Sequence, residues 1–231
     1  MNELINSINN SNVNCKGILI NVNNKNTNVI LGEENILVDG QNYITDKLCD
    51  LEFKLSVPSF FQINRSQAEK LYKIAIEFAH LNQDKTILDL YCGTGTITLL
   101  MAKQAKKAIG IEIVNEAIED AKQNATINKI KNTEFICANA ADGANQIISR
   151  NIKIDTICCD PPRKGLDSQS IESILKIAPK SIVYVSCDPA TLARDLKIFT
   201  ANNYNITKGQ AIDMFPRTAH VETVMLLEKI I

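Results

Sequence analysis

The stretch TILDLYCGTGT, residues 86–96, decides the fold of this chain. Its first six residues are mostly apolar and partly β-branched, as in a parallel strand that is buried on both faces. Gly93 and Gly95 follow directly, and glycine lets the backbone turn sharply and approach a ligand closely. A helix that begins near Thr96 would point its free N–H groups into this turn. The stretch therefore predicts a strand, a glycine loop and a helix around a nucleotide-like ligand.

Two residues near this loop indicate which nucleotide. A dinucleotide-binding loop has the pattern G-x-G-x-x-G/A, whereas the third small position here is Thr98. Glu112 closes the strand-like run at 108–113, about twenty residues after Tyr91, where an acid is expected to bind a ribose hydroxyl pair. This combination favours S-adenosylmethionine over NAD. The alternative is a Rossmann-like loop in which the glutamate only caps the core.

Composition limits the class of protein and its compartment. At 231 residues, the chain is long enough for one α/β domain and a smaller region. The 25 basic and 26 acidic residues give no positive field, which argues against strong unaided RNA binding. Seven cysteines without a secretory signal or a membrane-length apolar run predict a cytoplasmic protein with reduced thiols. No C-x-x-C pair occurs, and adjacent Cys158 and Cys159 cannot both face one metal, so no metal site is expected.

The N-terminal quarter differs in composition from the remainder. Residues 1–14 are rich in asparagine and serine, which predicts an unstructured tail. From Cys15 to Val57, short β-rich runs alternate with turn residues and predict a small antiparallel region. These runs are GILINV, NVILG, NILV and LEFKLSV.

From Asn64 onwards, strands and helices alternate. Asn64 and Gln67 resemble a capping box, and apolar residues at helical spacing follow, so a helix precedes the first strand. The predicted parallel strands are 86–91, 108–113, 133–138, 154–160 and 181–187. The predicted helices include one near 96–106, one that buries Val114, Ala117, Ile118, Ala121 and Ala125, and one capped by Asp188 with Pro189 first. Two final strands, 204–213 and 220–228, complete a Rossmann-like α/β fold with a doubly wound, mostly parallel sheet and a C-terminal antiparallel hairpin.

Ligands of such sheets bind beyond the carboxyl ends of the strands. Five conspicuous features fall at that edge: Tyr91 to Gly95, Glu112, Asn139, Asp160 to Arg163, and Cys187. Taken singly, Asn139 could be a turn former and Cys187 a structural cysteine. The Pro-Pro pair after Asp160 gives a rigid ledge without backbone donors, which suits a flat base. Because all five features converge on one edge, we predict a ligand site there.

The position of Cys187 suggests a reaction. It stands near the N-terminus of a helix, where a thiol's pKa is lowered, although neighbouring Asp188 opposes this effect. A cysteine beside a methyl donor suits alkylation of a carbon such as uracil C5: the thiolate adds at C6, C5 takes the methyl group, and a base removes the C5 proton. In HVET, His220 and Glu222 would face the same side of a strand, and either could be that base or a polar surface residue.

Five segments of the chain are distinctive: FFQINRSQAEKLY, LDLYCGTGT, DPPRKGLD, VYVSCDPATLARDL and FPRTAHVETV. Together, these segments strongly resemble the RNA uracil-C5 methyltransferase family, which makes 5-methyluridine in tRNA or large-subunit ribosomal RNA. The resemblance is dense from about residue 55 to the end and thins across 15–54. It implies a class I methyltransferase fold, S-adenosylmethionine as cofactor and RNA as substrate.

The resemblance also implies roles for individual residues. The family's nucleophile falls on Cys187 and its proton-abstracting glutamate on Glu222. Its cofactor contacts fall at the edge of the sheet described above: Gln62, Tyr91, Glu112 and Asp160, with Gly93 in the loop and with Thr96 and Asn139 as further positions.

The sequence departs from the family pattern at its beginning. Family members usually carry an N-terminal OB-like RNA-binding domain, and some carry an iron–sulfur cysteine cluster, neither of which is found here. We therefore expect a catalytic domain at 58–231, preceded at 1–57 by a tail and the remnant of a central β-rich region. A monomer that acts on 23S rRNA, or alternatively on tRNA, is expected. The rival interpretations are a non-catalytic fragment that binds cofactor without recruiting RNA, and an NAD-dependent oxidoreductase.

Overall fold

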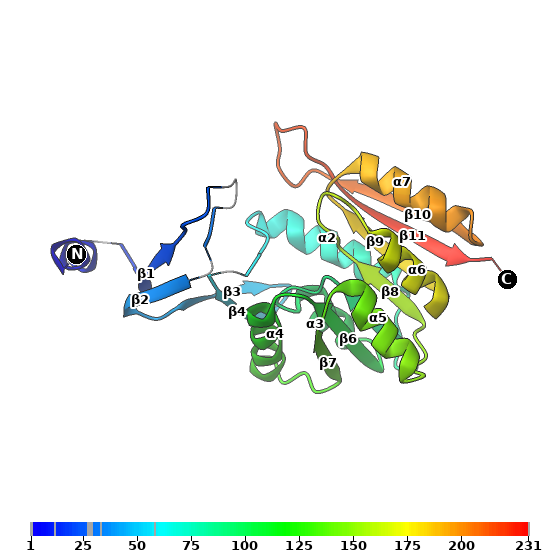
Figure 1. Ribbon diagram of the computed structural model, residues 1–231, viewed down its shortest axis with the longest axis horizontal. Helices are drawn as coiled ribbons and strands as arrows, with labels where there is room; N and C mark the ends of the chain where they lie inside the picture. The colour runs from blue at the N-terminus through cyan, green and yellow to red at the C-terminus, as the bar shows by residue number, and fades with distance from the viewer. Residues whose placement is uncertain (1, 12, 27–29, 33, 58, 231) are drawn as a thin grey trace.

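The computed structural model describes residues 2–11, 13–26, 30–32, 34–57 and 59–230. An α/β body holds most of the chain, and an N-terminal β ribbon projects from one side of it (Figure 1). The body contains a seven-stranded sheet of order β10-β11-β9-β8-β5-β6-β7. Its strands are β5 (Thr86–Leu90), β6 (Lys107–Glu112), β7 (Thr133–Cys137), β8 (Thr156–Cys159), β9 (Ser181–Ser186), β10 (Tyr204–Ile212) and β11 (Glu222–Lys229).

The topology of this sheet confirms the predicted fold class. Strands β5 to β9 are parallel, whereas β11 runs antiparallel to both β9 and β10. Strand β5 lies between β6 and β8, so the chain order reverses there. The carboxyl ends of β5 and β8 therefore flank the crevice where doubly wound sheets bind ligands.

Six helices cover the two faces of the sheet. Apolar residues of α2, α3 and α4 join one core cluster, and those of α5, α6 and α7 join the other. Alternate residues of each strand enter opposite clusters; for example, Ile87 belongs to the first and Leu88 to the second. The helices are α2 (Arg65–Phe78), α3 (Thr96–Ala102), α4 (Asn115–Ile127), α5 (Ala140–Ser149), α6 (Ser168–Ile177) and α7 (Pro189–Thr200).

The predicted helix caps are present, but two helix predictions need correction. Asn64 accepts a hydrogen bond from Gln67 N at 3.5 Å, and Asp188 accepts from the N–H groups of Ala190 and Thr191, which follow Pro189. Helix α3 ends at Ala102, before the predicted limit near 106. Val114 is 38% exposed rather than buried, because it is the capping residue before α4 and not part of the helix's inner face.

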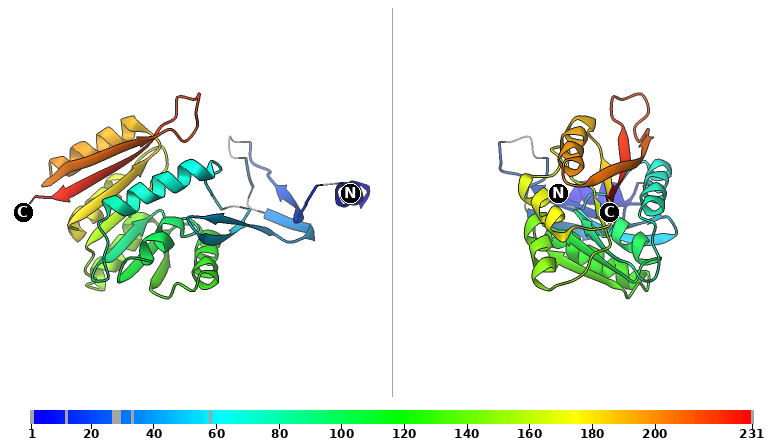
Figure 2. Two further views of the ribbon diagram at one scale, coloured as in Figure 1. Left: turned by 180° about the vertical axis from the view of Figure 1, so that it is seen from behind. Right: turned by 90° about the vertical axis from the view of Figure 1, so that its right-hand side faces the viewer.

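The N-terminal region contains two separate antiparallel hairpins. Strands β1 (Gly17–Val22) and β2 (Glu34–Gly40) pair in the projecting ribbon, while β3 (Tyr43–Leu48) and β4 (Leu51–Ser56) pair beside the body (Figures 1 and 2). The predicted run NVILG is not a strand where it is described, and its first two residues lie outside the described residues. Strand β3 was not predicted.

The tail is the other N-terminal correction. The prediction of an unstructured segment is wrong for residues 2–9, which form helix α1 (Asn2–Asn9). Ile5 and Ile8, one turn apart, are half-buried, and Asn9 donates a hydrogen bond of 2.7 Å to Asp39 on β2. An apolar pair at helical spacing and one contact with the ribbon therefore offset the low helix propensity of asparagine and serine.

Candidate active site

The glycine loop after β5 has an unusual backbone and an open face. Gly93 and Gly95 have positive φ angles of 52° and 81°, and Tyr91 has 66°. A Cβ on Gly95 would press against Ala121 and Phe135 at 3.1–3.2 Å, whereas a Cβ on Gly93 would meet nothing within 4 Å. Gly95 thus serves close packing, and Gly93 presents bare backbone to open space in which a ligand fits.

Glu112 lies against this loop, as the sequence predicted. Its carboxylate accepts N–H bonds from Gly93 at 3.2 Å, from Ile113 at 2.8 Å and from Val114 at 3.0 Å. A carboxylate offers about four acceptor sites, so about one is left for a hydroxyl donor. Glu112 therefore fixes the loop and can still bind a ribose hydroxyl.

Asp89, inside β5, is a candidate that sequence reasoning missed. It is buried, accepts a hydrogen bond of 2.6 Å from Thr98 Oγ1 on one oxygen, and has no partner on its other oxygen, Oδ1. Burial, with a contribution from Glu112, raises its pKa to about 7. Thr98, which breaks the dinucleotide pattern, thus supports an acid beneath the glycine loop. A lone acid in the apolar run TILDL was the available signal.

The other predicted cofactor residues differ in how firmly they are held. Gln62 is 8% exposed, and none of the described residues hydrogen-bonds its amide. The half-buried Tyr91 places its hydroxyl 3.5 Å from Ser170 Oγ. Asn139 is exposed, and its amide is occupied by Asp142 as the N-cap of α5. Gln62 and Tyr91 therefore keep hydrogen-bonding capacity for a ligand, whereas Asn139 has a structural duty.

The sheet register brings the two predicted catalytic residues together. Thr223 on β11 pairs with Ser186 on β9, so one more step along the same antiparallel register puts Glu222 beside Cys187. Glu222 is 7% exposed, and no described residue hydrogen-bonds its carboxyl group. Burial raises its pKa, and Arg163 opposes that rise.

Asp160, at the end of β8, completes a cluster of acidic groups. Burial, then the charges of Glu222 and Asp89, raise its pKa to about 8. The negative charges of Asp160 and Glu222 disfavour each other, so a cation bound between them would stabilise their ionised forms.

The pKa of the Cys187 thiol is raised, so the lowering expected at a helix N-terminus does not prevail. Burial raises it, and the charges of Glu222 and Asp160 add to the rise, outweighing the opposing influence of Arg163. Asp188 accepts the N–H groups of Ala190 and Thr191 at this helix N-terminus, at 3.0 and 2.9 Å. The resting thiol is therefore protonated.

The prediction that His220 shares a strand face with Glu222 is also wrong. Strand β11 begins at Glu222, and His220 lies before it, exposed, with its N–H bonded to Thr218 Oγ1 at 3.2 Å. The structure therefore favours Glu222 over His220 as a base.

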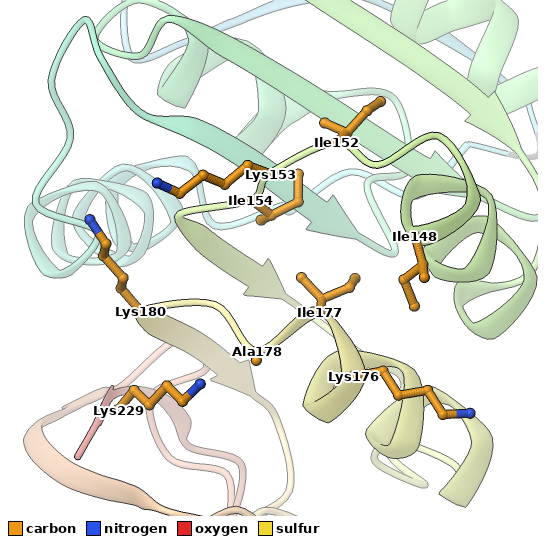
Figure 3. A pocket seen from close by; sticks show the side chains of 9 residues that line it. All are labelled: Ile148, Ile152, Lys153, Ile154, Lys176, Ile177, Ala178, Lys180 and Lys229. Atoms are coloured by element: carbon orange, nitrogen blue, oxygen red, sulfur yellow. The ribbon is translucent and has the colours of Figure 1, made fainter. Parts of the chain in front are cut away.

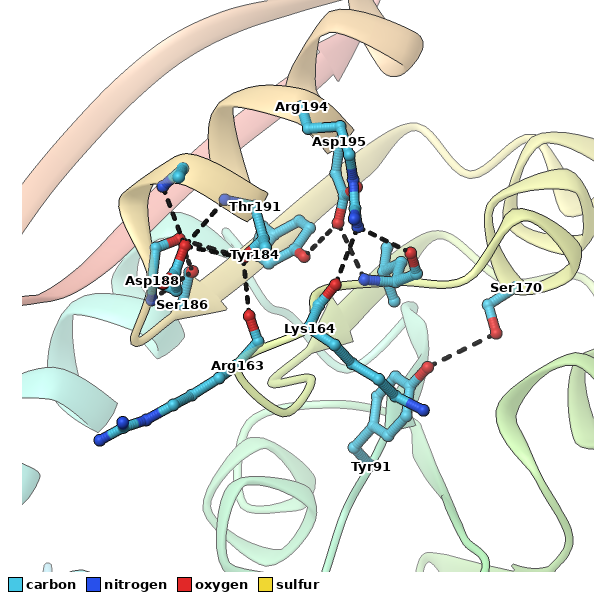
Figure 4. Close-up of polar contacts among 12 residues, drawn as sticks. Tyr91, Arg163, Lys164, Ser170, Tyr184, Ser186, Asp188, Thr191, Arg194 and Asp195 are labelled. Carbon is cyan, nitrogen blue, oxygen red and sulfur yellow. Dashed lines mark hydrogen bonds and ion pairs between the residues drawn. The ribbon is translucent and has the colours of Figure 1, made fainter.

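Helix α7 braces the loop that carries Asp160 and Arg163 (Figure 4). Thr191 Oγ1 donates to Arg163 O at 3.0 Å. Asp195, fully buried, accepts from Leu166 N at 2.8 Å, from the Tyr184 hydroxyl at 2.7 Å and from Arg194 Nε at 2.8 Å. These bonds fix the loop's backbone beside the site.

A separate hollow of about 420 Å³ lies at the opposite edge of the sheet (Figure 3). It is found at the amino ends of β8 and β9, away from the residues discussed above. Its lining consists of aliphatic residues and lysines: Ile148, Ile152, Lys153, Ile154, Lys176, Ile177, Ala178, Lys180 and Lys229. It is therefore not part of the candidate site.

Two searches over the described residues bear on metals and membranes. No group of three or more His, Cys, Asp or Glu side chains among them could hold a metal ion. Among the same residues, no helix has the length and apolar character needed to cross a bilayer.

Sequence comparison places the chain among RNA methyltransferases. The family model described as tRNA (Uracil-5-)-methyltransferase matches residues 3–230. An uncharacterized RNA methyltransferase of Clostridium acetobutylicum is 46% identical over 99% of this chain and 50% of its own length. One from Staphylococcus aureus strain MSSA476 is 48% identical over 92% of this chain and 47% of its own. The chain thus spans about half the length of these relatives.

Solved structures agree with this placement. The Pyrococcus abyssi tRNA (uracil-54, C5)-methyltransferase, crystallised with S-adenosyl-L-homocysteine, is 34% identical and superimposes with a TM-score of 0.74 over 92% of this chain and 50% of its own. An rRNA methylase from Streptococcus thermophilus, 16% identical, has a TM-score of 0.57 over 71% of this chain and 97% of its own, and shares the fold alone.

Proposed function

The chain belongs to the tRNA (uracil-5-)-methyltransferase family, and we propose that it methylates C5 of a uridine in RNA with S-adenosylmethionine. The observation that supports the proposal is the β9–β11 register, which pairs Thr223 with Ser186 and, continued by one step, would put Glu222 beside Cys187. Both lie at the same edge of the sheet as the glycine loop. A nucleophile, a base and a nucleotide-like site on one edge are what this reaction requires.

The residues at the edge fit S-adenosylmethionine, which supplies an electrophilic methyl group when bound. Gly93 offers open backbone, Glu112 retains an acceptor for a ribose hydroxyl, and Gln62 has an amide that no described residue hydrogen-bonds. Desolvation disfavours the ionised forms of the Asp89 and Asp160 carboxyl groups. A sulfonium cation bound nearby would stabilise those ionised forms. Tyr91, directly before the glycine loop, offers an aromatic ring for contact with the cofactor.

Cys187 opens the proposed reaction. Its Sγ, once deprotonated, forms a bond to C6 of the uracil ring, and the C5–C6 double-bond electrons become available at C5 for the methyl group. Because neighbouring carboxylates raise the thiol's pKa, a cation near the thiol favours this deprotonation. Arg163 supplies such a positive charge: it lowers the pKa of Cys187, which Glu222 and Asp160 raise, and it also lowers the pKa of Glu222.

Glu222 closes it. The carboxylate takes the C5 proton, the electrons of the C5–H bond restore the double bond, and the C6–Sγ bond breaks to release Cys187 as a thiolate. A base that is buried and accepts no hydrogen bond from the described residues is well suited to this step, because burial raises its affinity for a proton.

Trapping of the covalent adduct tests the mechanism. Glu222→Gln should transfer one methyl group and then remain attached to RNA, giving a protein–RNA complex that survives denaturing electrophoresis. Cys187→Ala should give neither adduct nor 5-methyluridine. His220→Gln is the matched control and should behave as wild type. Normal turnover by Glu222→Gln would contradict the role of Glu222, and methylation by Cys187→Ala would contradict the covalent route.

The substrate RNA and the division of the chain are further parts of the proposal. We assign methyl transfer to residues 58–231 and treat 1–57 as an accessory β-rich region. Mass spectrometry of tRNA and of 23S rRNA after incubation with the chain decides between the two RNA classes. Cofactor binding without methylation of either RNA would favour the non-catalytic interpretation, and binding of NAD in place of S-adenosylmethionine would favour an oxidoreductase.

A further inference from the structure

Helix α4 covers the outer edge of strand β4 with three polar side chains spaced four residues apart. Asp120 accepts from Ser56 N at 2.9 Å. Asn124 accepts from Lys54 N at 2.7 Å and donates to Lys54 O at 3.2 Å. Asn128 accepts from Glu52 N at 2.9 Å and donates to Glu52 O at 2.6 Å.

The spacing explains why a helix can replace a strand here. Four helical residues advance about 6 Å, and two strand residues about 6.7 Å, so Asp120, Asn124 and Asn128 keep step with every second residue of β4. The other edge of β4 pairs with β3. The β3–β4 hairpin is therefore attached to the body by hydrogen bonds from α4, in addition to the core packing of Leu48, Leu51, Phe53 and Leu55.

Of the three side chains, Asn124 is the one with a hydrogen bond to the glycine loop among the described residues. Its Nδ2 also donates to Thr94 O at 3.1 Å, and Thr94 lies between Gly93 and Gly95 in the glycine loop. The side chain is fully buried, and its acceptor and both of its N–H donors are used. One amide thus joins the hairpin, helix α4 and the loop.

We propose that Asn124 is a positioning residue that couples docking of the β3–β4 hairpin to the shape of the glycine loop and hence to cofactor affinity. The inference rests on the proposed function, in that the glycine loop must bind S-adenosylmethionine. Glu112 holds the Gly93 N–H on one side of the loop, and Asn124 holds the Thr94 carbonyl on the other. Coupling of this kind is reciprocal, so bound cofactor must also strengthen docking of the hairpin.

Calorimetry of the whole chain with S-adenosyl-L-homocysteine tests the forward direction. Asn124→Ala should weaken binding by about three- to tenfold, the value of a lost hydrogen bond. Asn128→Ala removes the same kind of hairpin contacts but none to the loop, and should stay within about twofold of wild type. Equal weakening by both variants, or unchanged affinity in Asn124→Ala, would overturn the coupling while leaving the proposed function intact.

Hydrogen exchange of the wild type tests the reverse direction and decides the matter if Asn124→Ala does not fold. Saturating S-adenosyl-L-homocysteine should slow exchange of the Lys54 N–H, in wild type and in Asn128→Ala alike. Protection of the glycine-loop amides without any change at Lys54 would overturn the coupling. If the wild type binds no S-adenosyl-L-homocysteine at all, the proposed function itself fails, and the coupling with it.

Discussion

Buried or partly buried carboxyl groups occupy two regions of this molecule, and their surroundings differ. In the brace between α7 and the 163–166 loop, Asp195 accepts three hydrogen bonds, and under β4 Asp120 accepts three from Ser56 and Ser59. At the carboxyl edge of the sheet, Asp160 and Glu222 accept none from the described residues.

The two regions differ in whether the protein itself supplies hydrogen bonds to the carboxylates. A carboxylate that the protein fully satisfies stabilises the native state, whereas an unsatisfied one costs stability until something else satisfies it. The high pKa of Asp160, about 8, reflects that cost. We interpret the first pair as structural and the second as reserved for ligands.

The largest effect should come from the structural region. Asp195→Ala leaves the Tyr184 hydroxyl and the Leu166 N–H without their acceptor, so the free energy of unfolding should fall by about 3–5 kcal/mol. Chemical denaturation measures it. Asp167→Ala, which removes an exposed helix cap, is the control and should cost about 1 kcal/mol. An Asp195→Ala loss no larger than that would remove the distinction between the two regions.

The pH dependence of cofactor binding tests the ligand region. A bound sulfonium cation lowers the pKa of Asp89 and Asp160, which in the free protein are about 7 and 8, so binding releases protons and strengthens as pH rises. Between pH 6.5 and 8.5, we expect affinity for S-adenosylmethionine to rise by about tenfold relative to S-adenosyl-L-homocysteine. S-adenosyl-L-homocysteine lacks the sulfonium cation but carries the same amino group, so it serves as the reference for titration of the ligand itself. A constant ratio in calorimetry would contradict the assignment.

Asp160→Asn should stabilise the protein by about 1 kcal/mol while impairing cofactor binding. The wild-type carboxyl group has a folded pKa of about 8, above its ordinary 3.8, so its cost grows as pH rises between these values and is constant above them. The gain in melting temperature should therefore be larger at pH 8.5 than at pH 5. The exposed Asp84→Asn variant should show no such trend. A destabilised Asp160→Asn would place Asp160 with the structural carboxylates.

The smallest effect concerns Cys187. Glu222→Gln removes a negative charge that raises the thiol's pKa, so iodoacetamide should label Cys187 about threefold faster at pH 8. Peptide mapping separates this site from the exposed Cys15 and Cys137, whose rates should not change. Slower labelling of Cys187 in the variant would show that Glu222 assists its ionisation instead.

The parallel core was predictable because its local signals agree with its final environment. The apolar runs at β5 and β9 are buried along nearly their whole length, and the caps at Asn64 and Asp188 form as expected. Strand β3 was missed because YITDKL is exposed over most of its length and carries no apolar alternation. Its pairing with β4 alone makes it a strand.

The positions of the candidate residues at the sheet edge were predictable, but their electrostatics were not. Strand ends located Glu112, Asp160 and Cys187, since position in the sheet decides where each lies. The raised pKa of Cys187 depends on a carboxylate from β11, which only the antiparallel register brings near. Asn124 could not be predicted either, because an asparagine within a helix usually lies on a solvated face.

The ladder along β4 also bears on solubility. An open strand edge is a template on which a second chain can add its own strand, and repeated addition leads to aggregation. The side chains of Asp120, Asn124 and Asn128 occupy the hydrogen-bonding positions that such a strand would need. Because their donors and acceptors are fixed to a helix, they end the ladder and cannot extend it. Helix α4 thereby closes the β4 edge of the hairpin to a further strand.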